Sequence, residues 1–94
     1  MRKTKIICTI GPASNSYDML EKLAAAGMDI VRLNMSHGDH ESAAKVIKSI
    51  QTLNKKITHP IAVLLDTQGP EIRTGDLATE LELKNGSIIS ITVR

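Results

Sequence analysis

Residues 61–66 read IAVLLD, an unbroken apolar run that follows Pro60 and ends on the carboxylate of Asp66. The run lacks the alternation of a half-buried strand, so it predicts a parallel strand that is covered on both faces. Two further short runs rich in β-branched residues precede it, at residues 5–10 and 30–34. Both are followed by residues typical of turns, which predicts two more buried strands.

Helical periodicity fills the two intervals between these predicted strands. Over residues 16–26, Asn15 or Ser16 can cap the start, Gly27 supplies the stop, and the apolar stripe is Met19, Leu20, Leu23 and Ala24. Over residues 40–55 the stripe is Ala43, Val46, Ile47, Ile50 and Leu53. The order strand, helix, strand, helix, strand predicts an α/β fold with a parallel sheet and right-handed crossovers.

The pattern changes after residue 75. Residues 81–84 and 89–93 alternate between apolar and polar side chains, and Asn85-Gly86 between them is a strong hairpin-turn signal. We therefore expect an antiparallel hairpin here. Residues 1–74 are assigned to one domain and residues 75–94 to the start of a second.

Composition excludes several classes of partner. The 12 basic and 10 acidic residues leave a formal charge of +2 and are scattered, which argues against a nucleic-acid surface. No apolar run reaches membrane-spanning length, and the N-terminus lacks a signal-peptide pattern, so we expect a cytoplasmic protein without a membrane partner. The single cysteine, Cys8, is expected to be a small buried hydrophobe in a reducing compartment.

Polar residues follow each predicted strand, and in α/β sheets and barrels ligands bind at the carboxyl ends of parallel strands. This rule selects Thr9, Gly11, Pro12, Ser14, Arg32, Asn34, Ser36, His37, Asp66, Thr67, Glu71 and Arg73. The two guanidinium groups suit bidentate contacts with phosphate or carboxylate. The neutral oxygens with one carboxylate suit a hard cation, best a weakly bound monovalent ion. Residue types alone predict an anion-binding α/β protein.

Each candidate also has a structural interpretation. Arg32 lies inside an apolar strand, where it needs a partner, so it can form an ion pair with no role in binding. Asp66 can serve a turn or a helix cap, and His37 can bond a loop carbonyl. Arg73 and Glu71 can form a solvated surface pair.

Three stretches carry a family resemblance: KTKIICTIGPAS at 3–14, VRLNMSHG at 31–38 and LDTQGPEIRTG at 65–75. In this order and spacing they resemble the opening of pyruvate kinases. The resemblance implies the first three β/α units of a (β/α)8 TIM barrel, with a small β domain inserted after the third strand. It implies that Arg32 contacts the transferring phosphoryl group. It also implies a potassium site formed by Asn34, Ser36, Asp66 and Thr67. The residues implied to line the nucleotide side are Asn34, Ser36, His37 and Arg73.

The implied reaction transfers the phosphoryl group of phosphoenolpyruvate to ADP, giving pyruvate and ATP, the last step of glycolysis. It uses Mg²⁺ and K⁺, and the Mg²⁺ ligands are expected outside this chain, so the 94 residues alone are expected to be inactive. A homotetramer is implied for the complete enzyme. Gln68 stands where many members carry lysine, and no role is assigned to it.

Two other interpretations remain open at this point. One is a short noncatalytic phosphate-binding or subunit-binding protein derived from a pyruvate kinase. The other is a self-contained flavodoxin-like phosphate binder, which requires a closed core that melts cooperatively.

Overall fold

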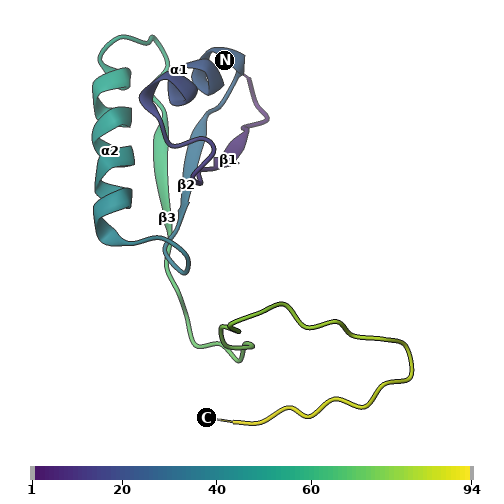
Figure 1. Cartoon of the computed structure of the whole chain (residues 1–94). Helices are drawn as coiled ribbons and strands as arrows, with labels where there is room; N and C mark the ends of the chain where they lie inside the picture. Colours follow the sequence, from purple (N-terminus) through teal and green to yellow (C-terminus); the bar gives the residue numbers. More distant parts are fainter. Residues whose placement is uncertain (1, 94) are drawn as a thin grey trace.

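The architecture is a small parallel sheet with two helices on one face (Figure 1). The computed structural model describes residues 2–93. Its elements run β1 (Ile7–Thr9), α1 (Tyr17–Ala26), β2 (Ile30–Asn34), α2 (His40–Asn54) and β3 (Ala62–Asp66). The strand order is β1-β2-β3, with both pairs parallel. The predicted α/β class and element order are confirmed.

The ends of both helices are set by local chemistry. Ser16 caps α1, where its hydroxyl accepts a hydrogen bond from the Met19 N–H at 3.3 Å. The helix ends at Gly27, whose φ of 123° favours glycine. Asp39 caps α2, where it accepts a hydrogen bond from the Ser42 N–H at 2.7 Å. The predicted Ser16 and Gly27 signals are confirmed.

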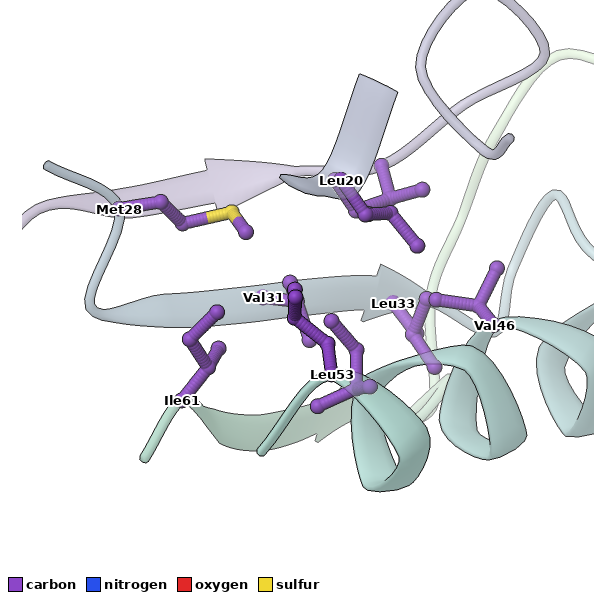
Figure 2. Close-up of a cluster of buried hydrophobic side chains, with 9 residues drawn as sticks. Leu20, Met28, Val31, Leu33, Val46, Leu53 and Ile61 are labelled. Carbon is purple, nitrogen blue, oxygen red and sulfur yellow. The ribbon is translucent and has the colours of Figure 1, made fainter. Parts of the chain in front are cut away.

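The core lies between the helices and one face of β2 (Figure 2). Val31 and Leu33 of β2 are buried on this face, and Leu20 is buried on α1. Helix α2 contributes Val46, Ile50 and Leu53. Burial of each such side chain stabilises the fold by roughly 1.5–3 kcal/mol.

Two predictions about burial are wrong in detail. Met19 is exposed, because α1 packs through Leu20 and the partly buried Leu23 and Ala24. Strand β3 is also not covered on both faces, since its residues Val63, Leu64 and Leu65 are 37%, 38% and 51% exposed. The reason is that β3 lies at the edge of the sheet and that, among residues 2–93, no helix or strand covers the face opposite the two helices (Figure 1).

Residues 67–93 leave the α/β unit as a wide loop that contains no helix or strand (Figure 1). The predicted turn forms: Gly86 has a φ of 80°, and the Ser87 N–H donates to the Lys84 carbonyl at 3.1 Å. The flanking residues do not pair, so the predicted antiparallel hairpin is wrong for this structure. An isolated two-stranded hairpin is marginal in water, and its apolar side chains are exposed here. The domain division at residue 75 stays a prediction.

The extended loop also explains the dimensions of the molecule. Its radius of gyration is 18.2 Å, against about 12 Å for a compact chain of this length. The excess reflects residues 67–93, which extend away from the buried core of the α/β unit (Figure 1). Within residues 2–93, neither helix is both long and apolar enough to cross a membrane.

Candidate functional site

The polar candidates on the strands share one face of the sheet. Residues paired across parallel strands point to the same side, and Thr9 pairs with Arg32 while Asn34 pairs with Asp66. Val31 and Leu33, the two neighbours of Arg32 in β2, are buried against the helices. The alternation of a strand therefore places the four polar side chains on the opposite, helix-free face, at its carboxyl end.

Arg32 connects the three strands through its guanidinium group. Its Nε donates to Oδ2 of Asp66 at 3.1 Å, and its Nη2 donates to the same oxygen. Its Nη1 donates to Oγ1 of Thr9 at 3.1 Å. A guanidinium has five N–H donors, so these contacts leave one donor on each of Nη1 and Nη2. The structural ion pair is thus present, and two N–H donors of the guanidinium are left over.

The ion pair is only partly shielded from water. The Arg32 side chain is 31% exposed and that of Asp66 is 44% exposed, so solvent weakens their attraction. Asp66 is neither a turn residue nor a helix cap here, because its side chain binds Arg32 from the last position of β3. The site is therefore a positively charged group, oriented by a carboxylate and open to ligands.

The proposed cation ligands gather around the ends of β2 and β3. Oδ1 of Asn34 accepts a hydrogen bond from the Ser36 N–H at 3.1 Å, and the Met35 N–H donates to the Asp66 carbonyl at 3.0 Å. Among residues 2–93, no hydrogen bond is found to Oδ1 of Asp66. Thr67 follows directly. Neutral oxygens beside one carboxylate oxygen fit an alkali cation in kind.

His37 and Asn34 both line an open cavity near the carboxyl ends of β1 and β2. This cavity of about 390 Å³ separates the loops after β1 and β2 from the start of α2, and its lining includes Thr9, Asn34, His37 and Ser42. A larger hollow of about 1000 Å³ lies near the amino ends of the strands, and its lining contains none of the predicted site residues. Ligands of such sheets bind at the carboxyl ends, which favours the smaller cavity.

Arg73 is not brought to this corner. It lies in the extended segment, with Nη1 3.5 Å from a carboxylate oxygen of Glu71, and both side chains are substantially exposed. Glu71 also accepts a hydrogen bond from Gln68 Nε2 at 3.0 Å. The solvated pair foreseen for Arg73 is the arrangement that the structure contains.

Two polar contacts were missed by reasoning from the sequence. The strand-end rule selected Thr9 but not its bond to Arg32, which depends on the register of β1 against β2. Asp29, before β2, accepts hydrogen bonds from the Ile6 N–H at 2.8 Å and from Arg2. The Ile6 N–H, assisted by the positive charge of Arg2, lowers the pKa of Asp29 below its ordinary value. A charged residue flanking an apolar run was the available signal for this contact.

The three parallel strands pair in chain order with both helices on one face of the sheet (Figure 1), an arrangement found in successive β/α units of a barrel. Comparison with known proteins makes the assignment specific. The family model described as "Pyruvate kinase, barrel domain" matches residues 1–94. The chain belongs to the pyruvate kinase family.

Individual relatives agree with this assignment. The pyruvate kinase of Chlamydia muridarum is 50% identical over 90 residues, covering 96% of this chain and 19% of the relative. That of Geobacillus stearothermophilus is 52% identical over 93 residues, covering 98% and 16%. Plastidial pyruvate kinase 2 of Arabidopsis thaliana is 48% identical over 93 residues, with the same coverage of 98% and 16%. The chain thus spans less than a fifth of their length.

A solved structure supports the fold. The crystal structure of a pyruvate kinase from Cryptosporidium parvum superposes with a TM-score of 0.67 at 49% identity. The match covers 74% of this chain and 14% of that one. The three strands and two helices are therefore part of a pyruvate kinase barrel domain.

Proposed function

We propose that this chain supplies part of the active site of a pyruvate kinase, which transfers the phosphoryl group of phosphoenolpyruvate to ADP and gives pyruvate and ATP. The observation that carries the proposal is the Arg32 guanidinium, which is held at the carboxyl end of the sheet with two donors left over. Family membership and about 50% identity to pyruvate kinases support it.

Arg32 binds the transferring phosphoryl group in this proposal. Phosphoryl transfer relies mainly on positioning and on positive charge at the oxygens of the moving group. A guanidinium offers both, because two parallel N–H groups can bind two oxygens of one phosphoryl group. Asp66 restricts the orientations that are open to the arginine before substrate arrives.

The nucleotide side is assigned to Asn34, Ser36, His37 and Arg73. Asn34 and His37 line the cavity beside the loop after β2, which supports placing them together. Arg73 pairs with Glu71 in the extended segment, so its contact with nucleotide requires that segment to approach the sheet.

Potassium is assigned to Asn34, Ser36, Asp66 and Thr67, whose oxygen donors fit it in kind. A bound cation supplies positive charge that offsets repulsion between two anionic reactants. Mg²⁺ is assigned to residues outside this chain. Within residues 2–93, no group of three His, Cys, Asp or Glu side chains is placed to hold a metal ion.

A cytoplasmic location and a homotetrameric complete enzyme belong to the same proposal, although one relative is named as plastidial. A second candidate, association with other subunits without catalysis, is favoured by the exposed apolar residues of β3.

The test is a coupled assay of pyruvate formation from phosphoenolpyruvate and ADP with Mg²⁺ and K⁺. It compares the 94-residue chain with the product of the complete reading frame. Arg32→Lys keeps the charge but loses the fork, so we expect kcat/KM to fall about 100-fold or more. Arg2→Lys is the matched control, since Arg2 binds Gly27 and Asp29 at the opposite end of the sheet. Equal kcat/KM for both variants, or no turnover by the complete product, contradicts the proposal.

A further inference from the structure

The contact between Thr9 and Arg32 is not explained by the roles assigned so far. Thr9 is the last residue of β1, and its register partner in β2 is Arg32. Its Oγ1 accepts a hydrogen bond from Nη1 of Arg32 at 3.1 Å. This hydroxyl is therefore the second fixed point of the guanidinium, on the strand opposite to Asp66.

Asp66 alone does not determine how the guanidinium is turned. Both of its hydrogen bonds with Arg32 end on one oxygen, Oδ2. A group held at a single acceptor atom can still rock about that atom. A second acceptor at Nη1 sets the plane, and with it the direction of the two donors that remain.

Threonine is well suited to provide this second point. Its branched side chain has restricted χ1 freedom, and β1 is held in register by pairing with β2. Thr9 is exposed, so water competes for its hydroxyl and the hydrogen bond adds little to stability. Its value lies in orientation of the arginine.

We infer that Thr9 is a positioning residue, whose hydroxyl aims the free donor pair of Arg32 at the phosphoryl group of the substrate. The inference rests on the proposed function of Arg32 and extends it to a residue on a different strand. Thr9 itself does not contact the substrate in this scheme.

The kinetic test uses the product of the complete reading frame and three threonine variants. Thr9→Val keeps the shape and removes the hydroxyl, so KM for phosphoenolpyruvate should rise about 3- to 10-fold, the effect of one modest hydrogen bond. Thr9→Ser restores the hydroxyl and should stay within about twofold of the parent. Thr52→Val is the matched control, because the Thr52 hydroxyl binds the Lys48 carbonyl within α2, away from the site.

A double-mutant cycle separates positioning from a general structural effect. If Thr9 acts through Arg32, Thr9→Val has no further effect on KM in the Arg32→Lys background. The same loss in both backgrounds, or a Thr9→Val enzyme equal to Thr52→Val, overturns the inference and leaves the role of Arg32 intact.

A third measurement does not depend on enzyme activity, so it tests the role of Thr9 even if the proposed function is wrong. Nitrogen-15 NMR of the 94-residue chain reports rotation of the Arg32 guanidinium, which should be faster in Thr9→Val than in the parent and restored in Thr9→Ser. If the complete product does not turn over, the proposed function fails and this measurement still decides the contact. Unchanged rotation in a folded Thr9→Val chain overturns the inference.

Discussion

Replacement of Asp66 by asparagine separates the structural and functional uses of the same ion pair. One carboxylate oxygen of Asp66 accepts hydrogen bonds from Nε and Nη2 of Arg32, with an Nε–Oδ2 distance of 3.1 Å. Asparagine keeps the shape of the side chain and one oxygen but removes the negative charge. The arginine then keeps an acceptor and loses its counter-charge.

The expected loss of stability is small. An unscreened hydrogen bond to a charged group contributes about 1.5–3 kcal/mol. Solvent reaches both partners, so we expect Asp66→Asn to lower the free energy of unfolding by only about 1 kcal/mol. Glu41→Gln is the matched control, because Glu41 and Lys45 are 4.0 Å apart and 82% and 77% exposed. Its effect should be close to zero.

The expected loss of activity is larger, because Asp66 is proposed both to orient Arg32 and to bind the alkali cation. We expect kcat/KM to fall about 10- to 100-fold, which corresponds to about 1.4–2.7 kcal/mol of transition-state stabilisation. The potassium concentration for half-maximal rate should also rise. A purely structural ion pair predicts neither change.

Two assays measure these quantities. Urea denaturation of the 94-residue chain gives the change in stability, and initial rates of the complete product at varied phosphoenolpyruvate and K⁺ give the kinetic change. An Asp66→Asn enzyme with kcat/KM within twofold of the parent refutes the reasoning. The reasoning also fails if the fraction of folded enzyme falls by the same factor as the activity, because the loss of stability would then explain the whole loss of activity.

The remaining predictions concern stability. Leu20 is fully buried, so Leu20→Ala should cost about 3 kcal/mol in urea denaturation, whereas Leu81→Ala, at an exposed position, should change stability by less than about 0.5 kcal/mol; equal losses contradict the assigned core. The Ile6 N–H and Arg2 lower the pKa of Asp29, so its contribution to stability is present above about pH 4 and is lost as pH falls through the folded-state pKa. Asp29→Asn should therefore reduce the fall of Tm that accompanies a decrease in pH below about 4. If the fall of Tm is unchanged in this variant, other carboxylates cause it and the prediction is wrong.

Local chemistry explains why the helices and the middle strand could be predicted closely. Helix α1 was expected over 16–26 and runs Tyr17–Ala26, because the Ser16 cap and the Gly27 stop act within a few residues of the helix. Strand β2 matches its predicted bounds, Ile30–Asn34. These signals depend on neighbours in the sequence, which are always present.

Burial and strand pairing were predicted less well, because they depend on distant partners. The apolar run of β3 indicates what the strand requires, namely cover on both faces, but residues 2–93 leave Val63 and Leu65 exposed. The hairpin failed for the same reason. Its Asn85-Gly86 turn forms locally, while strand pairing needs a surface to pack against.

For the candidate site, the strand-end rule selected residues that the structure places at one corner of the sheet, but it did not predict their contacts. Arg32, Asn34 and Asp66 could be selected because strand ends share one edge of a sheet. That Arg32 needs a partner also follows from its apolar strand. The register of the strands decides that Arg32 contacts the oxygens of Asp66 and Thr9. The sequence alone does not determine register for such short strands.

The helix-free face of the sheet shows why the ion pair of Arg32 and a binding role are compatible. At the amino end of this face the register row is apolar, formed by Ile7, Ile30 and Ala62. In the next row of this face, two residues further along β2, Arg32 introduces a charge that an apolar strand tolerates only when it is paired. Full pairing would consume all five donors, whereas Asp66 and Thr9 use three. The arrangement therefore satisfies the requirement of the fold and leaves two donors, which in the proposed function bind the anionic substrate.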